Sequence, residues 1–411
     1  MMSNIIYRDS IWVAFSAILV LFMNFGLAFF YSGYVSKRNV LNTIKMSMIT
    51  LGIVPVVWWF IGYSLVFSGS GHFFGSTDLI FLRVIRPNSI IANTTVLSVA
   101  FICFQAMFAS ISPAIISGAG VERMRFNSYL IFIILWTIIV YCTIAHSLWN
   151  SNGIAAQFGA FDFAGGVVVH VSAGFSGLAL AIILKPRSDP TLRQSKQSLP
   201  YTVLGFGMLW FGWFGFNAGS ALNISEIAIN AIATTLFATS ASMMAWLFCD
   251  LVTARRKTIS GICGSAIMGL VAITPSAGYV SISSAICIGA ITSVLSYILT
   301  RFYIKLKRKV DDTLDVFSCH GIPGFLGSIL VGVFASHDIN PNIPNGLIYN
   351  GSVGLLYKQM VVTVCAALFS FTATLFILFI LDKIVGNRVS VDDEISGMDI
   401  VEHGEEAYGN E

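Results

Sequence analysis

Charged residues and paired cysteines are scarce in this chain. Only 10% of its 411 residues are Asp, Glu, Lys or Arg, while 56% are hydrophobic, whereas a soluble domain carries about 25% charged residues. The seven cysteines lie singly, without a Cys-x-x-Cys pair, so we interpret them as small core residues and expect neither disulfides nor a metal site. The net charge of +3 gives no support for a nucleic-acid partner. These shortages argue against a soluble domain and against a disulfide-rich secreted one.

A basic segment is also missing ahead of the first apolar run. A cleaved signal peptide carries its positive charge before its apolar core, whereas Lys37 and Arg38 follow the run here. Neither end of the sequence carries an apparent lipidation motif. The first apolar run is therefore expected to stay in the protein as a membrane span.

Apolar runs of membrane-crossing length fill most of the chain. Runs of about 20 apolar residues predict transmembrane helices, and the sequence predicts eleven of them, the eighth short and rich in glycine. We expect an all-α polytopic membrane protein, with a transmembrane domain over residues 1–382 and a cytosolic tail over residues 383–411. The predicted spans are 11–34, 44–67, 94–117, 127–148, 163–184, 201–220, 228–249, 260–274, 279–300, 316–335 and 359–382.

The basic residues gather in alternate loops between the predicted spans. Of the 23 Lys and Arg residues, the exceptions are Arg8, Arg83, Arg86 and Lys358. Cytoplasmic loops retain the positive charge of a membrane protein. The sequence therefore predicts an N-terminus outside and a C-terminus inside, as an odd number of spans requires.

Two histidines interrupt the apolar spans in the same local pattern. Residues 170–177 and 320–327 both read His-x-x-x-Gly-Phe-x-Gly, and an aspartate precedes each histidine, at Asp162 and at Asp315. An ionisable side chain inside a span costs on the order of 2.5–3.5 kcal/mol even on the mildest scale. A lone histidine of this kind is more often a satisfied core residue that joins two helices. The repeated context favours equivalent helices that face one another across a pathway.

An aromatic segment rich in glycine ends the sixth predicted span. It reads Gly-Trp-Phe-Gly-Phe-Asn-Ala-Gly-Ser at residues 212–220, and close helix packing is the simplest account of its glycines. Trp149 follows the fourth span, and Phe104, Gln105 and Phe108 lie in the third, toward the same outer side. An aromatic cluster there could attract a small cation through ring quadrupoles, at roughly 0.5–2 kcal/mol per contact.

Together, these motifs resemble those of the ammonium transporter (Amt/Mep/Rh) family, and most closely its Amt branch. The resemblance implies eleven helices, with two inverted five-helix repeats followed by a final helix. It also implies a homotrimer in the cell membrane, with one pore in each subunit. The resembling segments lie in one order between about residues 11 and 408, at 28–31, 37–42, 122–126, 162–170, 212–220 and 315–321.

The resemblance also implies a site for ammonium on the outer side. Trp149, Phe108 and Ser220 would form this recruitment site. Asp162 would support it from the start of the fifth helix without being a direct ligand, although an aspartate at a helix start is usually just an N-cap.

Below that site, the resemblance implies a gate and a pore. Phe108 and Phe216 would stack as the gate, and His170 and His320 would line the narrow pore beneath it. Positions with weaker individual support along the pathway are Tyr141, Trp213, Phe104, Gln105 and Asn217.

The sequence departs from the family pattern at three places. Ser32 stands where the family commonly has glycine, Ser318 lies near the second histidine, and Pro323 lies in the tenth helix. None of them removes a residue assigned to the pore. Because proline lacks a backbone donor, Pro323 is expected to alter the local bend of its helix.

The polar tail has two interpretations. It contains eight acidic residues between 383 and 411, and composition alone predicts a solvated, disordered end. The resemblance instead implies that segments 397–399 and 403–408 pack beneath a neighbouring subunit and couple the pores. It also implies a face on which a PII-type regulatory protein can block transport.

A mechanism follows from these residue types. An apolar pore with few oxygens penalises any cation that must stay charged, and burial favours deprotonation of ammonium. Ammonium can lose its proton, whereas potassium cannot. Imidazoles can donate to ammonia, accept from it and relay a proton, since their unperturbed pKa lies near neutrality. The sequence leaves open whether transport is electrogenic or electroneutral.

Other functions fit parts of the sequence less well. A neutral gas channel of the Rh type needs no cation site, so Trp149 and Ser220 count against it. An ammonium receptor would be favoured by a fused signalling domain, but only about 29 residues follow the last predicted span. An enzyme is disfavoured, since no nucleophile–base–acid set accompanies the two histidines, and no cofactor is expected.

Overall fold

The protein is a bundle of long apolar helices. The computed structural model describes residues 2–188, 196–306, 310–350 and 352–408. Over these residues β-type pairing is limited to two isolated bridges, Ile90 with Leu97 and Met124 with Arg388. Ten helices in this part of the chain are long and apolar enough to cross a membrane. The all-helical polytopic architecture predicted from the sequence is therefore confirmed.

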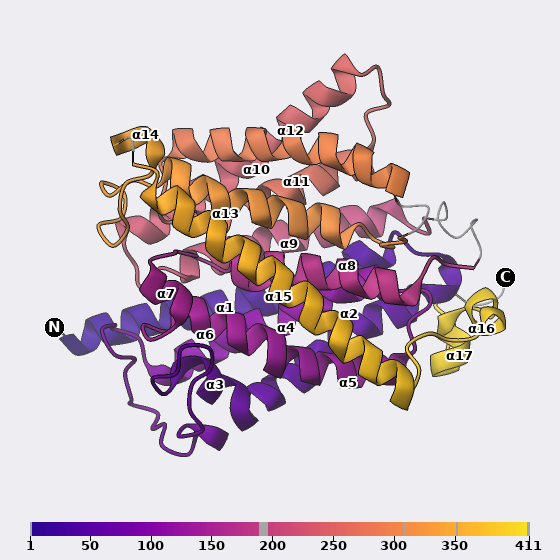
Figure 1. Ribbon diagram of the computed structural model, residues 1–411, viewed down its shortest axis with the longest axis horizontal. Helices are drawn as coiled ribbons and strands as arrows, with labels where there is room; N and C mark the ends of the chain where they lie inside the picture. The colour runs from indigo at the N-terminus through magenta and orange to yellow at the C-terminus, as the bar shows by residue number, and fades with distance from the viewer. Residues whose placement is uncertain (1, 189–195, 307–309, 351, 409–411) are drawn as a thin grey trace.

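The first part of the chain forms the lower layers of the bundle in Figure 1. The N-terminus and the short helix α7 lie at the left end of this view. Each of α2 and α4 contains a proline, at Pro55 and at Pro113, and so lacks one backbone hydrogen-bond donor. The helices are α1 (Met2–Ser32), α2 (Val40–Val57), α3 (Tyr63–Phe67), α4 (Ser98–Gly120), α5 (Phe126–Trp136), α6 (Cys142–Trp149), α7 (Ile154–Phe158) and α8 (Ser172–Leu184), with short 3₁₀ turns at Lys37–Asn39 and Ile80–Leu82.

The second part completes the bundle and adds the tail. The long helix α15 runs diagonally across the front of Figure 1, and α16 and α17 lie at the right end, opposite the N-terminus. The two chain ends therefore lie at opposite ends of the bundle. The helices are α9 (Leu199–Gly219), α10 (Glu226–Val252), α11 (Ile259–Ile273), α12 (Ile282–Leu306), α13 (Ile322–Phe334), α14 (Leu347–Asn350), α15 (Gly354–Ile384), α16 (Val391–Ser396) and α17 (Met398–His403).

The eighth predicted span corresponds to α11. This helix has 15 residues and so rises about 22 Å, less than the hydrocarbon core of roughly 30 Å. Most of its residues are buried against neighbouring helices, so it need not face lipid along its whole length. The count of eleven spans stays a prediction.

The glycines of the segment 212–220 serve helix packing, as their simplest interpretation predicted. A Cβ added to Gly212 would lie 2.3 Å from Cγ of Met23, and one added to Gly215 would lie 2.6 Å from Cβ of Leu19. Both partners belong to α1. The helices α1 and α9 can therefore approach closely because α9 lacks side chains along this face.

Among the residues that the structure describes, wide π-helical turns occur within four of the spans. Their hydrogen bonds skip one residue more than in an α-helix, and such turns are frequent at functional sites. One of them contains His170 and another contains His320. They are η2 (Trp58–Gly62), η4 (Thr137–Tyr141), η5 (Gly166–Val171), which leads into α8, and η7 (Phe317–Gly321), which leads into α13.

Pro323 lies at the start of α13, immediately after the π-helical turn η7. The backbone stays helical from η7 into α13, with φ −61° and ψ −56° at Gly321, so Pro323 lies inside a continuous helix and removes one backbone donor from it. The altered bend expected at Pro323 stays a prediction.

The tail is ordered where its composition alone predicted a solvated, disordered end. The side chains of Glu394 and Asp399 are buried. Asp399 accepts hydrogen bonds from the backbone N–H groups of Leu41 and Asn42, at 3.0 and 2.8 Å. These donors lie in the first turn of α2, where a carboxylate is favoured by the helix dipole. The composition-based prediction is therefore wrong for this part of the tail, because distant residues supply its partners.

Candidate functional site

Four aromatic side chains from three helices meet in the bundle. The rings of Phe108 on α4 and Phe216 on α9 are stacked, with centroids 4.0 Å apart and planes 18° from parallel. Phe104 packs edge-on against Phe108 at 4.8 Å. Trp149, the last residue of α6, points its ring edge-on to Phe108 at 6.1 Å. The stacked pair therefore lies next to Trp149.

Asp162 holds this end of the bundle together. Its two carboxylate oxygens accept four backbone N–H groups, those of Gly165, Gly166, Val167 and Val168, at 2.7–3.0 Å. Its backbone oxygen accepts the indole N–H of Trp149 at 2.9 Å. The carboxylate is buried and fully occupied, so it orients Trp149 and the start of η5 and is not placed to bind a ligand directly.

Ser220 lies beside the same cluster. Its hydroxyl donates to the backbone oxygen of Phe216 at 2.9 Å. The neighbouring Gly219 lies against the ring of Phe104, since an added Cβ would be 3.0 Å from that ring. Because the hydroxyl proton is used in this bond, the oxygen keeps a free lone pair as an acceptor.

His170 and His320 meet below the stacked rings. Their Nδ1 atoms lie 3.2 Å apart, and their rings are nearly parallel, with centroids 5.3 Å apart. The side chains are buried, at 1% and 5% exposure. For neutral rings, one Nδ1 must donate and the other must accept. One histidine therefore presents a free acceptor at Nε2, and the other presents an Nε2–H donor.

Glycine brings the two histidine helices into backbone contact. A Cβ added to Gly174 on α8 would lie 2.2 Å from Cα of Gly321, the residue after His320. No larger residue fits at this crossing without moving one helix. The glycine of the repeated sequence pattern thus sets the separation of the two imidazoles.

The space around the histidine pair is a narrow slot. Its volume is about 10 Å³, close to the minimum for a single water molecule. The indole of Trp213 stacks on the His170 ring at 5.1 Å. A hydrated ion does not fit this slot. Its remaining lining is largely apolar and comes from Met23, Leu27, Phe30, Ile111, Ile115, Leu209, Phe216 and Ile267.

The pathway residues that had weaker individual support from the sequence do not all lie beside the slot. Gln105 and Asn217 are buried on the two helices that supply the stacked rings, and each has an amide oxygen without a partner among the described residues. Tyr141 instead packs with Trp58 and Trp136, at 6.2 and 6.5 Å. The structure therefore groups Gln105 and Asn217 with the slot's helices, and Tyr141 with a separate aromatic cluster.

The aspartate that matches Asp162 in the second half is Asp312 and not Asp315. Its carboxylate accepts the backbone N–H groups of Val316 and Phe317 at the start of η7, at 3.0 and 2.8 Å. Asp162 and Asp312 each lie eight residues before their histidine. The pairing of Asp162 with Asp315 expected from the sequence is wrong, because the turn before η7 places the more distant aspartate at the helix start.

His146, which the sequence patterns did not single out, is buried away from the pair. Its Nδ1 lies 2.8 Å from the backbone oxygen of Val66, and its Nε2 lies 2.7 Å from that of Gly71. It therefore joins α6 to α3 and to the loop that follows α3. This is the structural role that a lone buried histidine usually has.

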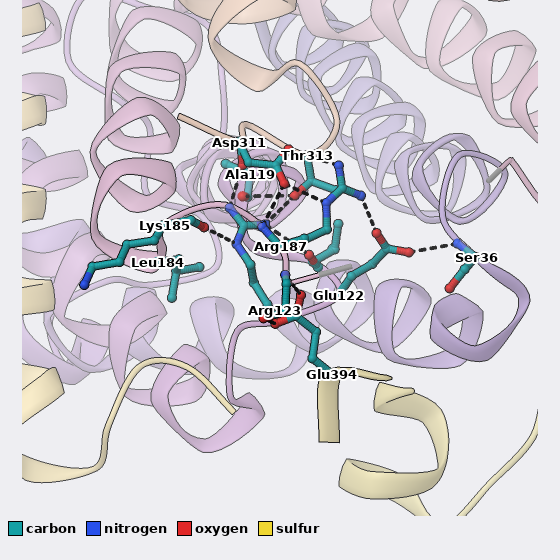
Figure 2. Close-up of polar contacts among 12 residues, drawn as sticks. Ser36, Ala119, Glu122, Arg123, Leu184, Lys185, Arg187, Asp311, Thr313 and Glu394 are labelled. Atoms are coloured by element: carbon teal, nitrogen blue, oxygen red, sulfur yellow. Dashed lines mark hydrogen bonds and ion pairs between the residues drawn. The ribbon is translucent and has the colours of Figure 1, made fainter. Parts of the chain in front are cut away.

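The sequence patterns also missed a buried ion network that follows α8 and precedes η7. Figure 2 shows its polar contacts. Arg187, which follows α8, pairs with both Glu122 and Asp311. Its Nε donates to Asp311 Oδ2 at 2.8 Å, and its Nη2 donates to Oδ1 at 3.0 Å. Burial alone would raise the pKa of Asp311, but the hydrogen bonds and charge of Arg187 hold that pKa well below its ordinary value.

This network is linked to both histidine helices and to the tail. Asp311 directly precedes Asp312, the cap of the helix start that carries His320, and Arg187 follows the helix that carries His170. Glu394 of the tail accepts the backbone N–H of Ser188, next to Arg187, at 2.6 Å. The network therefore fixes the ends of both histidine helices against the tail.

A multi-pass membrane protein with an apolar slot around two paired histidines is the class that this fold and site define. The profile of the Ammonium Transporter Family matches residues 11–408. The ammonium transporter of Bacillus subtilis is 40% identical over 400 residues, which cover 97% of this chain and 98% of that one. Ammonium transporter Amt1 of Archaeoglobus fulgidus is 36% identical over 399 residues, with the same coverage of 97% and 98%.

Solved structures agree with these relatives. Mep2 of Candida albicans is similar with a TM-score of 0.87 and 32% identity, covering 94% of this chain and 87% of that one. A protein described as a sensor Amt protein is similar with a TM-score of 0.88 and 29% identity, covering 98% of this chain and 100% of that one. The chain belongs to the ammonium transporter family and is a multi-pass protein of the cell membrane.

Proposed function

We propose that this protein carries ammonium across the cell membrane. Ammonium binds at Trp149, Phe108 and Ser220, gives its proton to outer water or to the His170–His320 pair, and crosses as ammonia between the two imidazoles. The paired histidines in the apolar slot are the observation that carries the proposal. In this account eleven helices span the membrane, with the N-terminus outside and residues 383–411 as a cytosolic tail.

The outer site combines an aromatic face with a hydroxyl acceptor. The rings of Trp149 and Phe108 offer negative faces to a cation. The free lone pair of Ser220 accepts one N–H of ammonium. In this proposal Asp162 holds the outer site in place and does not bind the ion, since its carboxylate is occupied by four backbone donors.

The slot selects for a species that can lose its charge. It offers a cation almost no oxygen ligands, so a potassium ion would lose its hydration without compensation. Ammonia fits, because the Nε2 acceptor and the Nε2–H donor of the pair match its own donors and acceptor. The stacked rings of Phe108 and Phe216 must separate for passage, and they act as the gate in this proposal.

The first expected result concerns the outer site. Trp149→Leu and Ser220→Ala should each raise the half-saturating ammonium concentration by about fivefold, since each removes roughly 1 kcal/mol of cation binding. Methylammonium uptake into proteoliposomes over a range of concentrations measures this. Trp59→Leu, which replaces an exposed tryptophan elsewhere, serves as the matched control. Variants with the wild-type concentration dependence would show that recruitment occurs elsewhere.

A neutral gas channel and an ammonium receptor remain the alternatives. A gas channel gains nothing from a cation site. A raised half-saturating concentration for uptake in Trp149→Leu would therefore count against a gas channel. The similarity to a sensor Amt protein gives the receptor its support, while the curated relatives described above are named transporters. Flux through purified protein separates transport from sensing alone.

The proposal includes assembly as a homotrimer with one pore in each subunit. A single chain already encloses the slot, so no pore is needed between subunits. Native mass spectrometry of the purified protein should give three copies. A monomer that retains full flux in proteoliposomes would contradict the need for assembly.

A PII-type regulatory protein binding on the cytosolic face also belongs to this proposal. Its support is the family membership together with the ordered tail at that end of the bundle. Binding of a purified PII protein to reconstituted transporter, with loss of flux, is the expected result. Flux that stays unchanged at saturating PII protein would contradict it.

A further inference from the structure

A larger cavity lies beyond the histidine slot, at the end of the bundle that holds the ion network. Its volume is about 520 Å³. Phe30 lines both this cavity and the slot, so the two spaces adjoin. The polar residues that matter here are Tyr34, Lys196, Ser260, Thr300, Asp315 and Ser318.

The ammonium group of Lys196 already rests against this cavity. Its Nζ donates to the hydroxyl of Ser260 at 2.9 Å and lies over the ring of Tyr34, 4.9 Å from the centroid. An aromatic face and a hydroxyl together are the groups that bind a primary ammonium. They are also the kinds of group proposed for recruitment at the opposite end of the slot. The chain's own lysine therefore shows that this cavity suits an ammonium ion.

Deeper in the cavity, two hydroxyls have no partner. Ser318 is 1% exposed, and its Oγ has no hydrogen bond among the described residues; the same holds for the hydroxyl of Thr300. Leaving a buried hydroxyl unsatisfied costs about 1–3 kcal/mol. Ser318 lies two residues before His320 in the same π-helical turn. A donor entering the cavity from the slot would meet this hydroxyl.

The cavity is lined by few charged groups. Arg187 is compensated by Asp311 and Glu122. The remaining charged groups of the lining are Asp315 and Lys196. Lys196 is an exposed side chain, so its ammonium group can move into solvent and a free ammonium ion can take its contacts with Ser260 and Tyr34.

We propose that this cavity is a second ammonium-binding site and that Lys196 occupies it as a tethered competitor. The ion binds between Tyr34, Ser260 and Ser318 once Lys196 withdraws. The inference rests on the proposed function, because it places this site at the exit of the same pathway. Because Lys196 occupies the site, the apparent affinity for free ammonium is low. Ammonium is therefore released and not retained.

The test uses tryptophan as a local reporter that does not depend on transport. Trp246 lines the cavity, while Trp149 lies at the opposite end of the slot. Full-length protein labelled with 5-fluorotryptophan gives ¹⁹F resonances, of which Trp246→Phe and Trp149→Phe identify these two. Ammonium chloride is titrated against sodium chloride at equal ionic strength.

The Trp246 resonance should shift saturably with ammonium and not with sodium. In Lys196→Gln the half-saturating concentration should fall by about tenfold, because a tethered group competes at an effective concentration in the millimolar range. The matched control Lys257→Gln, an exposed lysine outside the cavity, should behave as wild type. Adding Ser318→Ala to Lys196→Gln should weaken binding again.

An unresponsive Trp246, an equal response to sodium, or an unchanged half-saturating concentration in Lys196→Gln would each overturn the inference. The outer site is read separately in the same spectra. If Trp246 responds while Trp149 does not, the recruitment site of the proposed function fails and the second site stands. If only Trp149 responds, the reverse holds.

Discussion

His170→Ala and His320→Ala should each reduce selective ammonium flux by roughly 100-fold or more while leaving the protein folded. A positioned proton donor or acceptor contributes about that factor or more to a proton-transfer step. Each variant removes one member of the Nδ1–Nδ1 hydrogen bond. The remaining imidazole then lacks the partner that fixes its tautomer. Methylammonium uptake by proteoliposomes measures the flux, and gel filtration with thermal unfolding measures the folded state.

His337→Ala provides the matched control. His337 is an exposed histidine that contacts the backbone oxygen of Ile343, and its replacement should leave flux unchanged. If the histidine pair served only to join two helices, the alanine variants would lose folded protein and keep their flux per folded molecule. Well-folded variants with undiminished flux would rule out the paired-histidine mechanism.

Arg187→Met should destabilise the protein by about 3–5 kcal/mol, because removing one partner of a buried ion pair leaves the others uncompensated. Glu122 would lose its ion-pair partner, and Asp311 would keep only the charge of Arg123 and the backbone hydrogen bond from position 187 among the causes that lower its pKa. The thermal unfolding temperature and the yield of purified protein measure the loss. Arg187→Lys keeps the charge but not the forked contact with Asp311, so its loss should be smaller.

The matched control is Arg388→Met, which removes a less buried guanidinium from the pair with Glu394. Its unfolding temperature should fall less than that of Arg187→Met, and equal losses would contradict the central place of Arg187. The pH dependence follows from the lowered pKa of Asp311. Its stabilisation is fully present above the ordinary carboxyl pKa of about 3.9 and is lost as pH falls through the lower folded value. Acidification from pH 7 to pH 5 should therefore leave this contribution intact.

The long helices were predictable because hydropathy is a local property of the sequence. Ten apolar runs became long helices, and only α11 differed in length. Its burial depends on neighbouring helices that hydropathy does not register. The repeated pattern around His170 and His320 was likewise visible, since each copy lies within eight residues.

The ion network could not be predicted, because its members are far apart in the sequence. Arg187 meets Glu122 across 65 residues and Asp311 across 124. None of the three belongs to a repeated motif. Asp312 was overlooked although its eight-residue spacing to the histidine equals that of Asp162, because Asp315 lies closer and looked equivalent. Which aspartate caps the helix that carries His320 depends on where that helix starts. The turn before η7 sets this start.

Paired flux measurements with ammonium and potassium test the central claim most directly. Solid-supported membranes carrying wild-type protein report electrogenic carriage, and ammonia uptake into the same vesicles reports neutral passage. The account predicts that the wild type gives a signal with ammonium in at least one of these two assays. Potassium should give no signal in either. It also predicts that His170→Glu keeps ammonium conduction and admits potassium, because a carboxylate in the slot stabilises a bare cation. Potassium carried by the wild type as readily as ammonium would contradict selection by loss of a proton.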